Sequence, residues 1–274
     1  MAYLEQFFNI KNKIVVITGG SGILGSELCE GFLHAGAKVI LLDRNIEKLT
    51  KKVKLLKKIR DNVSGLVCNV LNEEELNVTN NQIISQFDKI DVLINAAGGQ
   101  IPGTTLTVNQ SVFDLGIIAF NKVTELNLVG TVLPTFIFGK TIAKQRNGSI
   151  INISSMASLR AITRVVGYSA AKAAIDNFTK WMAVEMALKY GDGIRVNAIA
   201  PGFFISDQNR NILINKKGNL TARAKSIIKL TPFKRFGKPE ELVGVALFLA
   251  SDASKFITGT VIPVDGGFSV FSGV

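Results

Sequence analysis

Three polar side chains of this sequence have the types and the spacing needed to move a proton at a substrate oxygen. Tyr168 and Lys172 are four residues apart in an amphipathic stretch, so both lie on one face of the helix that this stretch predicts. Ser155 precedes Tyr168 at the end of a short β-branched run. An adjacent ammonium stabilises a phenolate and lowers a tyrosine pKa that is ordinarily near ~10.

These groups suit hydride transfer between a nicotinamide and a carbonyl or alcohol carbon. Ser155 can bind the substrate oxygen while Tyr168 donates or accepts its proton. The alternative is that Tyr168 packs in the core and Lys172 is a surface charge. Because Tyr168 is one of only three tyrosines and stands in Gly-Tyr-Ser-Ala-Ala-Lys, we favour the catalytic interpretation.

A glycine-rich segment indicates where a dinucleotide binds. Gly20-Ser-Gly-Ile-Leu-Gly25 has the G-x-G-x-x-G spacing after an apolar run, where bare backbone and a helix N-terminus can hold a pyrophosphate. Asp43 follows at about the ~20-residue offset typical of a carboxylate that binds the adenosine ribose. The residues expected to contact the cofactor here are Gly19, Gly20, Ser21, Gly22, Ile23, Leu24, Asp43 and Arg44.

Asp43 and Arg44 make opposite predictions about the cofactor. The Asp43 carboxylate would repel the 2′-phosphate of NADP, whereas Arg44 could attract it. We favour NAD and keep NADP open. Asp43 could instead cap the following helix, although Asn45 could cap it equally well, and capping does not exclude a ribose contact.

The elements that position these residues alternate between strands and helices. Buried strands are predicted at 14–18, 38–42, 65–70, 92–95, 149–154, 195–200 and 261–264, and helices at 25–35, 46–60, 73–87, 109–144, 168–190 and 239–250. This order predicts an α/β fold, a doubly wound parallel sheet with helices on both faces, in one domain over 1–274. Gly, Asn and Ser clusters follow four of the strands, at the sheet edge where such folds bind ligands.

The combined motifs resemble the short-chain dehydrogenase/reductase family over essentially the whole chain. They are Thr18–Gly25, Asn95-Ala-Ala-Gly98, Asn127, Ser155, Tyr168-Ser-Ala-Ala-Lys172 and Pro201-Gly202. The resemblance implies a Rossmann-type sheet of about seven strands, a Ser-Tyr-Lys catalytic set and commonly a tetramer. It also implies that Asn127 holds a water in a proton relay to Lys172, and that Lys172 binds the nicotinamide ribose.

The same resemblance extends the expected cofactor site and marks three departures. It adds Asn69, Val70, Asn95, Ala96, Ala97, Gly98, Tyr168, Lys172, Pro201, Gly202 and Phe204, with 199–206 lining the nicotinamide. Ile23 stands where most members have a glycine, Asn69 replaces the usual aspartate at the adenine, and Ala96 replaces a second asparagine. None of these removes a group that hydride transfer requires.

Basic residues predict an anionic substrate. The segment 203–236, named the lid segment below, follows the sixth strand and carries eight basic residues against Asp207. Arg160, Arg164 and Arg210 are the best candidates for binding a carboxylate, because a guanidinium presents a planar fork to it. The alternative is that these arginines are simply exposed to solvent.

Four further segments resemble the D-mannonate oxidoreductase (D-fructuronate reductase) subgroup of the family: 125–140, 154–156, 202–210 and 267–274. That resemblance implies interconversion of D-fructuronate and D-mannonate. A 3-oxoacyl-[acyl-carrier-protein] reductase is the second candidate and a gluconate 5-dehydrogenase the third. A nucleotide-sensing module without turnover is disfavoured, because Ser155, Tyr168 and Lys172 are all present.

Composition excludes several other classes. The net charge of +11 arises largely from two places, each with eight basic residues, and the 44–60 stretch alternates lysines with apolar residues as a surface helix does, so we expect no nucleic-acid or membrane partner. Cys29, Cys68 and His34 have no metal-ligand spacing, so we expect no metal. No signal peptide and no run near ~18 apolar residues is visible, which favours a cytoplasmic protein.

Overall fold

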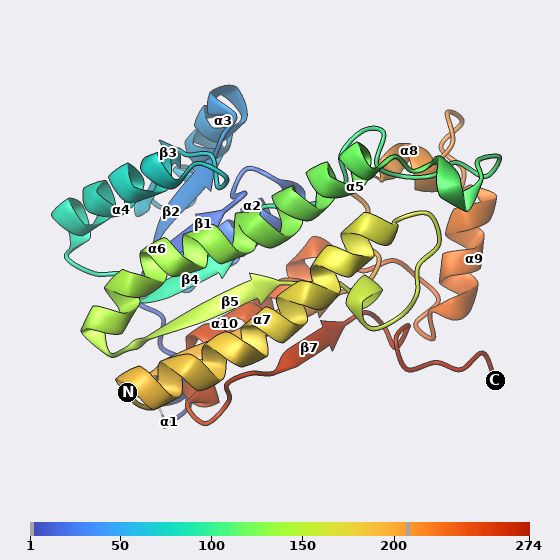
Figure 1. The fold of residues 1–274 in the computed structure, drawn as a ribbon. Coiled ribbons are helices and arrows are strands. Elements are labelled where there is room, and N and C mark those ends of the chain that lie inside the picture. Colours follow the sequence, from blue (N-terminus) through green and yellow to red (C-terminus); the bar gives the residue numbers. More distant parts are fainter. Residues whose placement is uncertain (1–2, 207–208) are drawn as a thin grey trace.

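The computed structural model describes residues 3–206 and 209–274, and its core is one parallel sheet. In these residues the sheet has seven strands in the order β3-β2-β1-β4-β5-β6-β7 (Figure 1). The doubly wound fold predicted from the strand and helix pattern is confirmed. The strand bounds are β1 Ile14–Thr18, β2 Lys38–Asp43, β3 Val63–Val67, β4 Val92–Asn95, β5 Gly148–Ile153, β6 Ile194–Pro201 and β7 Val261–Val264.

The strands form where β-branched residues can be buried on both faces of the sheet. Every residue of β1 and of β4 is buried, which is why these runs are continuously apolar rather than alternating. The register aligns the ends of neighbouring strands, because Thr18 pairs with Leu42 and Asn95, and Asn95 pairs with Asn152. The loops that follow these strands therefore start from one edge of the sheet.

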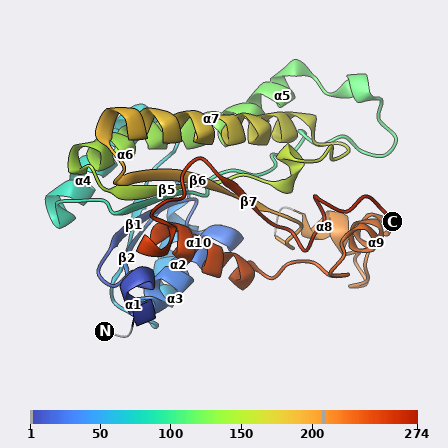
Figure 2. The same cartoon turned by 90° about the horizontal axis from the view of Figure 1, so that it is seen from below.

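Helices cover both faces of the sheet (Figure 2). One face packs against α2 (Ile23–His34), α3 (Ile46–Leu56) and α10 (Val243–Ala250). The other packs against α4 (Glu73–Phe87), α6 (Gly130–Gln145) and α7 (Val166–Tyr190). A short helix that the sequence pattern did not predict, α1 (Tyr3–Phe8), precedes β1 and has no buried residue.

The helix predicted over 109–144 is wrong in its first half. The chain instead forms a 3₁₀ turn, η1 (Val112–Asp114), then α5 (Ile117–Thr124) and a π-helical turn, η2 (Glu125–Val129), before α6 begins. Ser111 caps η1 and Gly116 starts α5, so polar and glycine residues interrupt the apolar period. The π turn displaces the register of the following helix and places Asn127 in the interior.

Two predicted boundaries also move. The third strand ends at Val67 rather than at residue 70, because Asn69 turns the chain by accepting a hydrogen bond from the Leu71 amide at 3.1 Å. The helix predicted over 46–60 ends at Leu56, where 3₁₀-type bonds from the Lys58 and Ile59 amides close its last turn. The helix predicted over 239–250 begins as a 3₁₀ turn, η4 (Pro239–Leu242).

The run Ile117–Gln145 is long and apolar enough to cross a membrane by composition. However, 56% of its most apolar window is buried inside the fold, and Ile137, Phe138 and Ile142 lie in the cluster on the sheet. The α6 part of this run is therefore a core helix that packs on the sheet.

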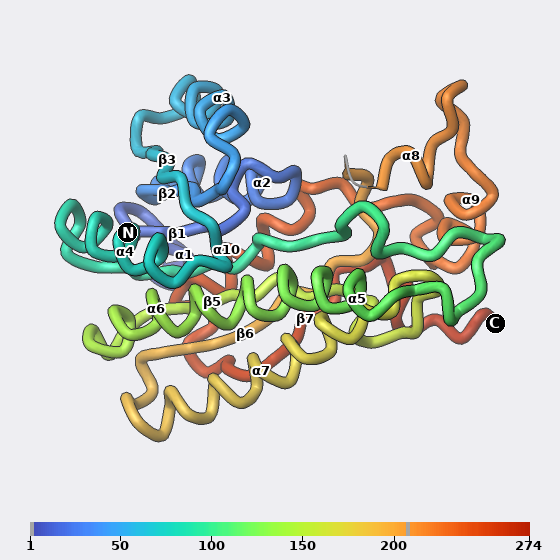
Figure 3. Tube along the Cα trace, turned by 45° about the horizontal axis from the view of Figure 1, so that its top comes forward, coloured from blue at the N-terminus to red at the C-terminus, as the bar shows by residue number. Residues whose placement is uncertain are grey.

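The lid segment stands out from the C-terminal end of the sheet (Figure 3). Its described residues contain α8 (Arg210–Leu213) and α9 (Ala222–Leu230). Leu213, Ala224 and Ile227 form a small apolar cluster of their own, separate from the two clusters on the sheet. The acidic Asp207, which the charge count of the lid includes, lies outside the described residues.

Candidate active site

The three residues of the expected catalytic set meet at the C-terminal end of β5. Ser155 follows this strand and caps a 3₁₀ turn, η3 (Met156–Ser158), by accepting a hydrogen bond from the Ala157 amide at 3.1 Å. A side-chain hydrogen bond joins Ser155 to Tyr168. The Lys172 ammonium donates to the Ile153 carbonyl at 2.7 Å and lies 5.5 Å from the centre of the Tyr168 ring. The predicted juxtaposition of hydroxyl, phenol and ammonium is therefore present.

The electrostatics of Tyr168 differ from the expectation. Burial raises the pKa of Tyr168, and the hydrogen bond with Ser155 acts in the opposite direction without cancelling that rise. Lys172 does not reverse the effect, because its ammonium lies over the ring and donates to a backbone carbonyl. In this state the phenol keeps its proton at neutral pH, which suits a proton donor.

Lys172 itself is nearly inaccessible and carries a strongly changed pKa. Burial lowers the pKa of Lys172 to about 8, while the Asp176 carboxylate acts to raise it. Asp176 is buried, and it accepts a hydrogen bond from the Ser154 hydroxyl. Sequence reasoning missed Asp176, although its position one helical turn after Lys172 was a usable signal.

Asn127 occupies the π-helical turn and connects two elements of the site. Its amide nitrogen donates to the carbonyls of Gly99 and Val123 at 2.9 and 2.8 Å, and its oxygen accepts from the Gly99 amide at 2.8 Å. A Cβ at Gly98 would lie 2.7 Å from the Asn127 oxygen and 3.7 Å from the Lys172 nitrogen. Asn127 and Lys172 thus approach the same backbone position, as a relay between them would require.

The glycine loop after β1 leaves its backbone bare. Gly19 has φ +63°, and a Cβ there would lie 2.7 Å from the Ala97 Cα atom. Gly22 is the N-cap of α2 and supplies no side-chain hydrogen bond to the first turn. The amides at this helix N-terminus therefore have no side-chain acceptor, and the loop can hold an anion such as a phosphate.

Asp43 lies beside this loop, where a ribose contact would need it. One carboxylate oxygen accepts the Ser21 hydroxyl and the other accepts the Asn45 amide at 3.0 Å. The helix after Asp43 is capped by Asn45, whose side chain accepts from the Lys48 amide at 2.9 Å. Asp43 is therefore not the cap of α3. Arg44 is exposed next to it.

Other expected cofactor residues form hydrogen bonds within the fold. Asn95 is buried and donates to Thr135 at 2.8 Å and to Asn152 at 2.9 Å. Asn69, with Val70 after it, forms the polar turn that follows β3. Thr18 was not in the predicted site, yet its hydroxyl accepts from the amides of Ala96 and Ala97 at 3.1 Å and joins the ends of β1 and β4.

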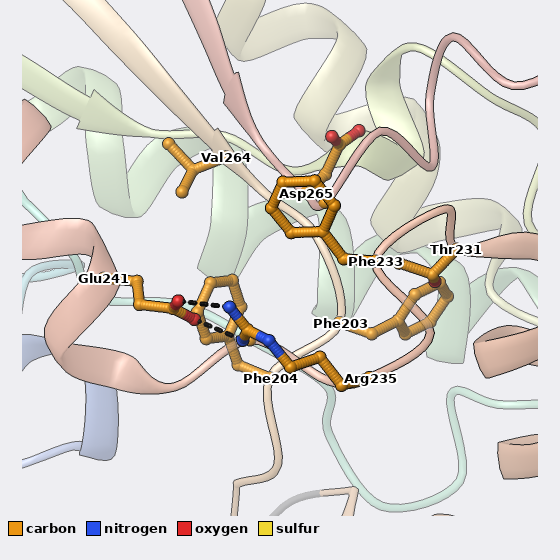
Figure 4. Close-up of a pocket in the computed structure, with 10 residues that line it drawn as sticks. Phe203, Phe204, Thr231, Phe233, Arg235, Glu241, Val264 and Asp265 are labelled. Atoms are coloured by element: carbon orange, nitrogen blue, oxygen red, sulfur yellow. Dashed lines mark hydrogen bonds and ion pairs between the residues drawn. The ribbon is translucent and has the colours of Figure 1, made fainter.

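The β6 end leads into a cavity of about 90 Å³ (Figure 4). Pro201 ends the strand, and a Cβ at Gly202 would lie 2.6 Å from the Asp265 Cα atom. Phe204 is buried against Gly237, so its ring lies in this cavity wall rather than at the catalytic set. Ser155, Tyr168 and Lys172 do not line the cavity, whose walls are Phe203, Phe204, Thr231, Phe233, Arg235, Gly237, Glu241, Val264, Asp265 and Gly266.

The three arginines proposed for the substrate have different surroundings. Arg160 donates to the carbonyls of Ser269 and Phe271 at 2.6 and 3.2 Å, so it holds the C-terminal tail. Arg164 has φ +76° and stands on the loop before α7. Arg210 begins α8 and is exposed. A fourth arginine, Arg223 of α9, was missed because only the fold brings it to that loop, 60 residues away in sequence.

Comparisons with known proteins agree with this geometry. A protein-family model described as enoyl-(acyl carrier protein) reductase matches residues 20–269. An uncharacterized oxidoreductase of Bacillus subtilis (strain 168), UxuB, is 43% identical over 97% of this chain and 98% of its own length.

Two solved structures are similar over nearly the whole chain. A candidate D-mannonate oxidoreductase from Haemophilus influenza, solved with bound NAD, has a TM-score of 0.89 at 41% identity, covering 97% of this chain and 98% of that chain. A gluconate 5-dehydrogenase from Burkholderia cenocepacia J2315, in complex with NADP and tartrate, has a TM-score of 0.85 at 29% identity, covering 97% and 99%.

Proposed function

Because the chain belongs to the short-chain dehydrogenase/reductase family, we propose that it is an NAD(H)-dependent oxidoreductase of a sugar acid, interconverting D-fructuronate and D-mannonate. The observation that carries the proposal is the meeting of Ser155, Tyr168 and Lys172 at one sheet edge, beside a bare glycine loop. In reduction, the carbonyl carbon gains a hydride and its oxygen gains a proton, so the ketone becomes a secondary alcohol.

The residues of the chain supply the binding and the proton. Ser155 donates a hydrogen bond to the substrate oxygen as negative charge develops on it. Tyr168, whose burial keeps it protonated, transfers its proton to that oxygen. A proton then returns to Tyr168 by way of Lys172, which regains it from solvent through a water that Asn127 holds. The bound reduced nicotinamide supplies the hydride.

The cofactor is NAD, with NADP as the weaker alternative. The bare amides at the start of α2 suit a pyrophosphate, and the Asp43 carboxylate beside Ser21 suits a ribose with free hydroxyls. Exposed Arg44 is the group that would favour a 2′-phosphate. The solved relatives provide one precedent for each cofactor, with NAD in the one that is 41% identical.

A sugar acid is supported by charge and by similarity. The lid segment carries eight basic residues, of which Arg235 pairs with Glu241, and an excess of positive charge attracts anions. The similar structures include a candidate D-mannonate oxidoreductase and a gluconate 5-dehydrogenase holding tartrate, which are both proteins described with polyhydroxylated acids.

A substrate panel tests the proposal. Purified enzyme is mixed with reduced cofactor and D-fructuronate, 5-ketogluconate or an acetoacetyl thioester, and cofactor absorbance is followed. D-Fructuronate should give the highest kcat/KM, and D-mannonate should reduce oxidised cofactor in the reverse assay. If the hexuronates are inert and the thioester turns over, the sugar-acid assignment is wrong.

The thioester arm represents the second candidate, a 3-oxoacyl-[acyl-carrier-protein] reductase. The matching family model is described with an acyl carrier protein, and the basic lid would also attract such an acidic partner. A gluconate 5-dehydrogenase is tested by the 5-ketogluconate arm of the same panel.

We also propose a cytoplasmic homotetramer or homodimer that works in carbohydrate metabolism. Trp181, Val184 and Leu188 of α7 and Phe136 of α6 are between 45% and 79% exposed, which is unusual for large apolar side chains on neighbouring helices. A second copy would cover this face. Light scattering after size exclusion should give a multiple of 29.6 kDa, and Trp181→Glu should lower it.

A further inference from the structure

Three loops from neighbouring strands meet near the N-terminus of α7. In the loop after β4, the Leu106 amide donates a hydrogen bond to the Arg164 carbonyl at 3.1 Å. The loop after β5 carries Thr163 and Arg164, and the segment after β6 carries Arg223 on α9. Figure 1 shows the loop before α7 and α9 at the same end of the sheet, beyond the strand ends. Ligands of doubly wound folds bind at that edge.

Arg223 is hydrogen-bonded to Thr163, in the loop before α7. Its guanidinium donates to the Thr163 hydroxyl at 3.1 Å and to the Thr163 carbonyl at 3.3 Å. These contacts bring the guanidinium of Arg223 next to Arg164, the following residue. Arg164 is held at φ +76°, a backbone conformation that costs a side chain energy and that is concentrated at functional sites.

The two arginines form an uncompensated pair of like charges. Within 3–206 and 209–274, no ion pair is formed by Arg164 or Arg223. Burial, and then the positive charge of Arg164, lowers the pKa of Arg223. A guanidinium nevertheless stays charged in proteins, so the repulsion persists until an anion lies between the two groups.

We propose that Arg164 and Arg223 together bind the substrate carboxylate, one from the loop that leads to Tyr168 and one from the lid segment. The proposal rests on the proposed function, because it takes the acid to be the substrate. Arg164 stands four residues before Tyr168 on the loop that leads into α7, so the pair lies at the end of α7 that carries Tyr168. Arg160 is then not part of the anion site, since its guanidinium holds the C-terminal tail.

The pair would determine specificity more than rate. A carboxylate held at one end of a six-carbon chain fixes which carbon faces the hydride donor, and this positioning is lost for a ketose without the acid group. A charge-assisted hydrogen bond of this kind changes affinity by roughly 10- to 100-fold. Recognition of the acid therefore depends on two residues that come from different loops.

The test compares four variants on one acid and one uncharged ketose. Arg164→Gln, Arg223→Gln and Arg223→Lys are assayed with D-fructuronate and D-fructose, and Arg60→Gln, at an exposed arginine that follows α3, is the charge-matched control. The Gln variants should lose about 10- to 100-fold in kcat/KM for the acid and less than about threefold for the ketose. Arg223→Lys should lose part of this, because it keeps charge without the planar fork, and Arg60→Gln should behave as wild type.

Calorimetric binding of D-mannonate to the enzyme with reduced cofactor separates the two claims. Arg-dependent binding without any hexuronate turnover by wild type would overturn the proposed function and support the anion site. Turnover by wild type with equal losses on acid and ketose, or with no loss, would overturn the anion site alone. The absence of both binding and turnover would overturn both proposals.

Discussion

In the proposed function the glycine loop after β1 and the lid segment after β6 both bind an anion, and they would do so in different ways. At the glycine loop the backbone itself is the binding surface, and Gly19, Gly20 and Gly22 leave it uncovered at a helix N-terminus. At the lid, the proposed binding depends on long charged side chains; Arg235 is paired with Glu241, whereas Arg223 forms no ion pair within the described residues. The first surface is formed by local sequence, and the second requires contacts between distant segments.

This difference teaches which parts of the site tolerate change. The glycine loop is packed against β4, because a Cβ at Gly19 would meet Ala97 at 2.7 Å. The lid has a small cluster of buried residues around Leu213, and Phe204 of the lid belongs to the larger cluster on the sheet. We expect substitutions at the loop to damage every reaction of the enzyme, and substitutions in the lid to change which substrate it takes.

The largest expected effect lies between the two surfaces, at Tyr168. Tyr168→Phe removes the only exchangeable proton of that side chain, so kcat should fall by about 10²- to 10⁴-fold. Cofactor binding, followed by fluorescence of the reduced cofactor, should remain close to wild type. Tyr190→Phe at the far end of α7 is the control and should keep full activity. Activity of Tyr168→Phe within about tenfold of wild type would remove Tyr168 from the mechanism.

The next largest effect should come from Gly19→Ala. A side chain there has both an unfavourable φ of +63° and a backbone contact at 2.7 Å, so we expect a loss of roughly 2 kcal/mol or more in the free energy of unfolding. Cofactor affinity should fall with it. Gly103→Ala is the matched control, since Gly103 has φ +81° but no atom within 4 Å of the added Cβ.

Chemical denaturation measures both glycine variants. If Gly103→Ala destabilises the protein as much as Gly19→Ala, backbone strain alone explains the effect, and the close packing of the loop against Ala97 has no energetic importance.

A smaller effect is expected at Asp43. Its carboxylate accepts the Ser21 hydroxyl and lies where a ribose hydroxyl would bind, so Asp43→Ala should lower kcat/KM with NADH by about tenfold. The same variant should lose less kcat/KM with NADPH, so the ratio of kcat/KM for NADH to that for NADPH should fall. Arg44→Ala should instead lower kcat/KM with NADPH more than with NADH, because it removes the charge that would favour a 2′-phosphate. A wild-type enzyme that clearly prefers NADPH would contradict this assignment.

The smallest effect is a pH dependence of stability that comes from Lys172. Burial lowers its pKa to about 8 in the folded chain, from an ordinary value of 10.5, so the unfolded chain binds more protons between these pH values. The free energy of unfolding should therefore rise with pH across that window. Lys172→Met removes the titration, and the wild-type advantage over this variant should grow from about pH 8 upward. If the free energy of unfolding of wild type, relative to that of Lys172→Met, falls as the pH rises, the lowered pKa of Lys172 is contradicted.

Patterns local in sequence predicted much of the fold, and they predicted that Tyr168 and Lys172 share one helix. The apolar run of β1 and the spacing of Tyr168 and Lys172 each reflect one element, and the period of that element is visible in the sequence. Asp43 could be placed at a strand end, but only the structure shows that Asn45 caps the next helix.

The features that the sequence did not reveal have a common physical cause. The π turn over Glu125–Val129 breaks the helical period because Asn127 is held by Gly99, a residue of another loop. Arg160 was expected at the substrate, yet carbonyls of the C-terminal tail hold it. Arg223 was overlooked because its partner Thr163 is distant in sequence. Long-range hydrogen bonds decide these positions, and periodicity does not report them.

The central claim is that this enzyme moves a hydride from a nicotinamide to the ketone carbon of a sugar acid. The most direct measurement is to supply reduced NAD carrying deuterium at the transferred position, together with D-fructuronate, and to analyse the product by mass spectrometry and NMR. We predict D-mannonate with one deuterium on the new carbinol carbon and none elsewhere. A product without deuterium at that carbon, or no aldonate at all while the cofactor stays reduced, would contradict the account.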